Sequence, residues 1–102
     1  MSQIVSDLRV QKILSHFEFL QAKLNDNLKN DELIKFSKEY SDLKPIYEHI
    51  QEVKKIKNEL SEAKELFYDP EFKDLASEEV SRLEERLFKQ EKQLQFLLIP
   101  KD

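Results

Sequence analysis

The chain has 102 residues, 17 of them basic and 21 acidic, which gives a net charge of −4, and it contains no glycine and no cysteine. This length is typical of one domain, the lack of cysteine excludes disulfides and thiolate chemistry, and the net charge excludes a strongly basic, nucleic-acid-binding chain. Phosphate-binding loops and strained catalytic turns usually need glycine, because only glycine reaches positive φ without steric cost. We therefore expect a protein that is not an enzyme and that binds no cofactor and no DNA.

The distribution of charged and apolar residues along the chain indicates where in the cell the protein works. The halves Met1–Glu52 and Val53–Asp102 each carry a net charge of −2, so neither is a basic tail. The longest apolar run, Phe96–Ile99, is far too short to cross a membrane, and no basic stretch followed by an apolar one opens the chain. These features predict a cytoplasmic protein with no membrane partner.

The first amphipathic segment runs from about Ile4 to Leu24. Its apolar residues recur at steps of three and four, which places them on one face of a helix. The polar stretch Asn25–Asp31 follows, and its asparagine and aspartate side chains compete with helix by bonding their own backbone. We expect a helix followed by a turn.

A second amphipathic segment runs from about Glu32 to Phe67. Its apolar steps alternate between three and four until Ile50, where two steps of three follow one another. This irregularity makes the apolar face drift around the helix axis. We therefore expect a change of packing partner near Val53.

Pro45 lies inside the second segment. A proline there removes the hydrogen bond to the Ser41 carbonyl, at a cost of about 3 kcal/mol in an undistorted helix, and disfavours helical geometry at Lys44. We expect a kink or a short break at Leu43–Lys44.

A third amphipathic segment begins at Asp69, Pro70 and Glu71, a strong signal for the start of a helix, with Asp69 accepting from the free amides and Pro70 in the first helical position. Its apolar face continues to Leu97, and Pro100 is expected to end it. On its polar face we expect two exposed ion pairs, Glu78–Arg82 and Glu85–Lys89, because each acid stands four residues before its base.

Together these segments predict an all-α fold. The expected architecture is an elongated antiparallel bundle of three main helices, of which the second is long and kinked near Pro45. We expect residues 1–102 to form a single helical domain.

Few residues are candidates for a functional site. The two histidines, His16 and His49, stand far apart in the sequence with no cysteine nearby, so we expect neither to bind a metal. The densest basic cluster is Lys54, Lys55 and Lys57, which is either a solvated helix face or a contact for RNA phosphate or an acidic partner.

The aromatic residues divide into two groups. Phe67 and Tyr68 precede the expected turn at Asp69, where an aromatic side chain can stay exposed and contact a partner. The others are expected in the core or at its boundary rather than as platforms for base stacking: Phe17, Phe36, Tyr40, Tyr47, Phe72 and Phe88.

Three blocks of sequence resemble a known family. They are SKEYSDLKPIYEHI from Ser37, AKELFYDPEFKDLASEEV from Ala63 and LLIPKD from Leu97, with a looser match in ILSHFEFL from Ile13. In this order they resemble the amino-terminal helical domain of the bacterial peptide chain release factor one family, the class-I factors that read UAA and UAG.

The resemblance implies a role in docking. In that family the helical domain lies toward the base of the ribosomal stalk, which implies a ribosomal protein or rRNA as the partner. The Pro-x-Thr element that reads the codon and the Gly-Gly-Gln loop that promotes hydrolysis are both absent from this sequence. No catalytic residue can therefore be assigned, and we expect an excised domain, a truncated frame or a stand-alone relative.

Two other interpretations remain open. A free-standing helical coiled-coil adaptor would have the same apolar faces and would self-associate through exposed apolar surface, whereas the release-factor interpretation expects a monomer. An enzyme fragment whose site lies elsewhere is neither supported nor excluded by these residues.

Overall fold

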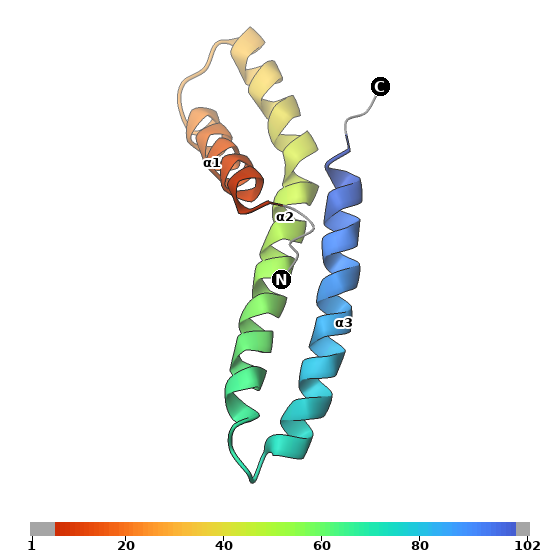
Figure 1. The fold of residues 1–102 in the computed structure, drawn as a ribbon. Helices are drawn as coiled ribbons and strands as arrows, with labels where there is room; N and C mark the ends of the chain where they lie inside the picture. Colours follow the sequence, from red (N-terminus) through yellow and green to blue (C-terminus); the bar gives the residue numbers. More distant parts are fainter. Residues whose placement is uncertain (1–5, 100–102) are drawn as a thin grey trace. The chain divides into compact units, whose positions relative to one another are not determined.

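The computed structural model describes residues 6–99, and these form three α-helices with no strand. The helices are α1 (Asp7–Leu24), α2 (Asn30–Leu66) and α3 (Lys73–Leu97), joined in this order by two short connections (Figure 1). The all-α prediction is confirmed. Ile4 and Pro100, where we expected one helix to begin and another to end, lie outside the described residues.

The first helix begins where a side chain satisfies its free amides. The Ser6 hydroxyl caps α1 by accepting a hydrogen bond from the backbone N–H of Arg9, at 3.2 Å. Asp7 lies in the first turn and Lys23 in the last, so each charge complements the helix dipole.

The chain divides into two compact units, Met1–Ile50 and Gln51–Asp102, and α2 contributes to both. In the first unit, α1 packs on the amino-terminal part of α2. Phe17 is only 1% exposed, and its ring stacks on those of Tyr40 and Tyr47, with centroids 4.9 and 4.1 Å away. These aromatic contacts form the centre of the first unit.

The contacts of the first unit give its register. Phe19 meets Phe36, and three residues earlier on α1 His16 meets Glu39, three residues later on α2. The residue numbers of the contacts fall along α1 while they rise along α2, so α1 and this part of α2 are antiparallel.

In the second unit, α3 packs on the carboxyl-terminal part of α2. The core cluster is formed by residues of both helices: Ile56, Leu60, Ala63 and Leu83, with Val80 and Leu87 partly buried against them. Arg86 donates a hydrogen bond to the Glu52 carboxylate, while Leu66 and Phe72 line one pocket. From the first of these points to the second, the residue number rises along α2, from Glu52 to Leu66, and falls along the chain that packs on it, from Arg86 in α3 to Phe72 just before α3. This pair of helices is therefore also antiparallel.

The two units confirm the expected change of packing partner on α2. Residues Phe36–Tyr47 contact α1, whereas Glu52 and Ile56–Ala63 belong with α3. The change falls next to Val53, where two consecutive steps of three rotate the apolar face.

Pro45 does not interrupt α2. The helix is continuous from Asn30 to Leu66, so the short break that we considered at Leu43–Lys44 is excluded, and a kink there stays a prediction. One physical reason why α2 continues through Pro45 is that this part of the helix is exposed to solvent. Because Ser41 and Pro45 both face solvent, water can bond the carbonyl that the proline leaves without a donor.

The predicted start of α3 is wrong by about three residues. Asp69–Phe72 is a turn, in which the Phe72 N–H donates to the Asp69 carbonyl at 3.0 Å, and α3 begins only at Lys73. The Asp69 carboxylate accepts from the Glu71 N–H at 3.0 Å, so it stabilises the turn instead of capping a helix. Pro70 occupies the second position of this turn, a place that its fixed φ favours.

Candidate functional site

Among residues 6–99 no group of three or more histidine, cysteine, aspartate or glutamate side chains is placed to hold a metal ion. Over the same residues, no helix is long and apolar enough to cross a membrane. The candidate sites are therefore surface patches.

The three lysines of the cluster differ in their exposure. Lys54 and Lys55 are exposed and line a shallow depression on α2, whereas Lys57 is half-buried and does not line it. Glu59 and Glu62 share the same depression. This surface has mixed charge, which weakens its attraction for phosphate.

The aromatic residues before the second turn are exposed, as the sequence predicts. Tyr68 is 86% exposed and Phe67 is 38% exposed, and their rings meet edge to face at 6.1 Å. The Lys73 ammonium lies 5.4 Å from the centre of the Phe67 ring, a cation–π contact. The turn holds Phe67 in place and leaves Tyr68 free to contact a partner.

A pocket beside this turn was missed by the sequence analysis. It has a volume of about 200 Å³, and its lining comes from both helices: Ala63, Leu66, Phe72, Leu75, Ala76 and Glu79. Leu66, Phe72 and Leu75 are all exposed. We call this the turn pocket. The signal for it was Leu75, an apolar residue that stands beside the apolar face of α3 rather than on it.

The position of Phe72 and Phe88 corrects an expectation. Both were expected in the core or at its boundary, yet Phe72 and Phe88 are exposed. Phe72 lies in the turn before α3, and Phe88 follows the half-buried Leu87 by one residue, which rotates it away from α2. Phe17, Phe36, Tyr40 and Tyr47 are buried or half-buried, as expected.

Ion pairs on α3 set the charge beside the turn pocket. Arg82 pairs with Glu79, three residues earlier, and not with Glu78 as we predicted, whereas the predicted pair Glu85–Lys89 is present at 3.3 Å. The hydrogen bond from Arg82 holds the pKa of the Glu79 carboxyl below its usual value of 4.5, and the same contact raises the pKa of Arg82. Glu79 is therefore ionised and compensated, and Glu78 is exposed beside it.

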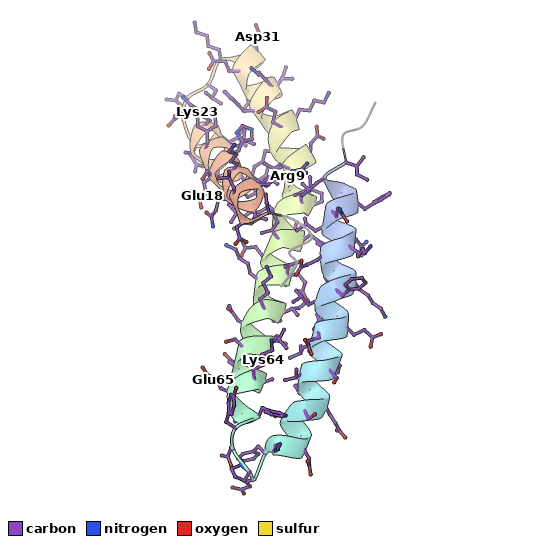
Figure 2. The ribbon with its side chains drawn as sticks, viewed as in Figure 1. Arg9, Glu18, Lys23, Asp31, Lys64 and Glu65 are labelled. Atoms are coloured by element: carbon purple, nitrogen blue, oxygen red, sulfur yellow. The ribbon has the colours of Figure 1, made fainter. Side chains whose placement is uncertain are left out.

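The first unit has a surface cluster that sequence analysis also missed. The Phe19 ring lies 6.0 Å from the rings of both His16 and Phe36. The ammonium group of Lys23 lies 5.7 Å from the centre of the Phe19 ring (Figure 2 labels Lys23), and that of Lys35 lies 5.9 Å from the centre of the Phe36 ring. Phe19 is off the apolar face of α1; His16 and Lys23 are neighbours on the same helix, whereas the contact with Phe36 is known only once α1 is paired with α2.

Two comparisons with known proteins, one with family models and one with curated sequences, agree with one another. A family model described as the PCRF domain matches residues 13–102. The chain is 34% identical to peptide chain release factor 1 of Ruegeria pomeroyi, over 97% of this chain and 28% of the relative. It is 36% identical to the protein of the same name from Jannaschia sp., over 92% of this chain and 27% of the relative.

The chain thus spans little more than a quarter of the length of these curated relatives. No solved structure matches it. The resemblance to release factor one, which rested on three blocks of sequence, is confirmed by relatives that align with nearly all of this chain. Because the family model covers all but the first twelve residues, the chain belongs to the PCRF domain family.

Proposed function

We propose that this chain is the ribosome-docking helical domain of a release factor that terminates translation at UAA and UAG. The observation that carries the proposal is the match of the PCRF domain to residues 13–102, together with relatives named peptide chain release factor 1. In this proposal residues 1–102 form one domain that works in the cytoplasm as a monomer and has no catalytic role.

The partner in this proposal is the base of the ribosomal stalk, through ribosomal protein or rRNA. Two patches are the proposed contacts: the lysine patch, Lys54, Lys55 and Lys57, and the aromatic residues at the turn, Phe67 and Tyr68. Their exposure supports the proposal, since Lys54, Lys55, Phe67 and Tyr68 are exposed. Both patches lie in the second unit.

Co-sedimentation of the chain with purified ribosomes tests the proposal. The chain is expected to pellet with ribosomes, to compete with intact release factor 1 on ribosomes halted at UAA, and to release no peptide itself. A chain that neither pellets nor competes would refute docking.

Matched variants then test the two patches. The double change Lys54→Glu and Lys55→Glu, or Phe67→Ser and Tyr68→Ser, is expected to weaken co-sedimentation. The control for the lysines is Lys12→Glu with Lys38→Glu, because both residues are exposed lysines of the other unit. The control for the aromatic pair is Phe96→Ser with Ile99→Ser, which also replaces two exposed apolar side chains.

A stand-alone helical adaptor is the second candidate. The observation that favours it is the exposed apolar surface of α3, where Phe88 and Phe96 both face solvent. Such a module would bury these side chains against a second copy or another helix. Its self-association separates it from the docking proposal.

A further inference from the structure

The turn pocket has the size and lining for one apolar side chain. A cavity of about 150 Å³ holds a benzene-sized group, and this pocket measures about 200 Å³. Five of its six lining residues are apolar, and Leu75 on its wall is 68% exposed. An apolar group that entered it would remove parts of Leu66, Phe72 and Leu75 from water, which the hydrophobic effect favours.

The charge around this pocket is unlike that of the rest of the chain. Residues 62–82 carry seven acidic and three basic side chains, a net charge of −4, which equals the net charge of the whole chain. The remaining residues are balanced, with 14 acidic and 14 basic side chains. The equal charge of the two halves thus hides a concentration of acid at one turn.

Two of these carboxylates stand at helical spacing from a leucine of the turn pocket. Glu78 follows Leu75 by three residues on α3, so the two lie on the same helix face. Glu62 precedes Leu66 by four residues on α2, and it also lines the depression that contains Lys54 and Lys55. Both glutamates are exposed, and over the described residues Glu79 is the only acidic residue of this segment with a salt bridge. Figure 2 shows Lys64 and Glu65 at the end of α2, next to the turn.

Charge decides which occupant fits. RNA phosphate would be repelled by this surface, because Lys64 and Lys73 are outnumbered and Lys73 already contacts the Phe67 ring. A second copy docked turn to turn would bring two net charges of −4 together. A basic protein segment carrying an exposed apolar side chain has neither problem.

We propose that the turn pocket receives one apolar side chain of a basic protein segment, with the surrounding carboxylates pairing its lysine or arginine residues. This inference rests on the proposed docking function and deepens it by giving the turn a protein partner of stated charge. It assigns no such partner to the lysine patch.

Titration of the full chain with a synthetic amphipathic peptide of lysine and leucine tests the inference. Binding, followed by fluorescence anisotropy of the labelled peptide, is expected to weaken with added salt. A lysine–serine peptide lacks the apolar side chain and a glutamate–leucine peptide lacks the charge, so both are expected to bind at least about tenfold more weakly.

Paired variants locate the binding. Leu75→Ala is expected to weaken binding about tenfold, whereas Leu8→Ala, at 67% exposure an equally exposed leucine of α1, is expected to have no effect. Glu78→Lys is expected to weaken it likewise, against the control Glu84→Lys. Both positions are exposed glutamates of α3, and circular dichroism checks that each variant remains helical.

Other results would overturn the inference. Equal binding by the Leu75→Ala and Leu8→Ala variants would place the peptide elsewhere, tighter binding of single-stranded RNA than of peptide would identify a nucleic-acid surface, and a dimer lost in Leu75→Ala would identify a second copy. Peptide binding without ribosome co-sedimentation would refute the docking function alone. Co-sedimentation without peptide binding would refute this inference alone.

Discussion

At the scale of single residues, Phe17 is the largest of the almost fully buried side chains of the first unit. Its ring is almost fully buried and stacks on two tyrosines of α2, and stacked aromatic pairs stabilise beyond their buried area. The tyrosines Tyr40 and Tyr47 are half-buried, so they form the wall between this ring and solvent.

Replacing Phe17 by alanine is expected to lower the free energy of unfolding by about 3–5 kcal/mol, because the change leaves a cavity and removes both stacked pairs. Urea unfolding followed by circular dichroism measures it. Phe96→Ala is the control, since Phe96 is 72% exposed and its loss is expected to change stability by less than about 0.5 kcal/mol. Equal effects of the two changes would contradict the packing described for Phe17.

Arg82 gives a pH-dependent prediction at the same scale. Its hydrogen bond lowers the pKa of Glu79, so the pair stabilises the fold above the usual carboxyl pKa of 4.5 and this contribution is lost as pH falls through the lowered value. In Arg82→Gln the pKa of Glu79 is expected to rise back toward 4.5. An NMR titration of the Glu79 carboxyl carbon measures the shift, and an unchanged pKa would show that the pair does not form in solution.

At the scale of the elements, α2 is a continuous helix with a proline, Pro45, in its interior. Pro45 costs it one backbone hydrogen bond, yet the helix continues, because α1 packs on both sides of the proline, against Tyr40 before it and Tyr47 after it. Tertiary contacts of this kind routinely override local propensity.

Pro45→Ala is expected to raise the free energy of unfolding by about 1–3 kcal/mol, since alanine restores the bond to the Ser41 carbonyl while the unfolded chain gains some freedom. Thermal unfolding measures the change, and amide hydrogen exchange is expected to slow near Pro45. Lys44→Ala, at the exposed neighbouring position, is the control. A destabilised Pro45→Ala variant would show that the helix is built around the proline.

The sequence predicts the helices well and their ends less well. Periodic apolar residues such as Ile13, Phe17 and Leu20 identify a helix face because packing demands that spacing. The Asp69–Pro70 pair is ambiguous, because the same two residues favour both a helix start and a β-turn. The choice between a helix start and a turn depends on the register in which α3 packs on α2. This register cannot be read from the spacing of residues in the sequence.

At the scale of the whole molecule, the turn pocket shows the limit of sequence reasoning about the site. Lys54, Lys55 and Lys57 lie within four residues of the sequence, so the sequence alone identifies them as a cluster. The residues that line the pocket come from two helices and the turn between them. Leu66 and Leu75 become neighbours only when the antiparallel register is known. The structure also shows that Lys57 is half-buried whereas Lys54 and Lys55 are exposed, a difference that the spacing of the three lysines does not predict.

The chain is expected to sediment as a monomer, because its net charge of −4 gathers at one turn and opposes association there. Sedimentation equilibrium over a range of concentrations measures the molecular mass. If the adaptor alternative holds, a dimer appears and the double change Phe88→Ser with Phe96→Ser abolishes it. In the docking proposal the same change leaves the mass unchanged.

One feature of the backbone makes all these experiments simpler to interpret. Across residues 6–99 no residue has a positive φ and no peptide bond is cis. Alanine therefore fits the backbone at each of these positions without steric cost, and only at Pro45 does it also restore a backbone hydrogen bond. In a library of single alanine replacements at the other positions, the replacements that weaken binding would map the side chains that contact the partner.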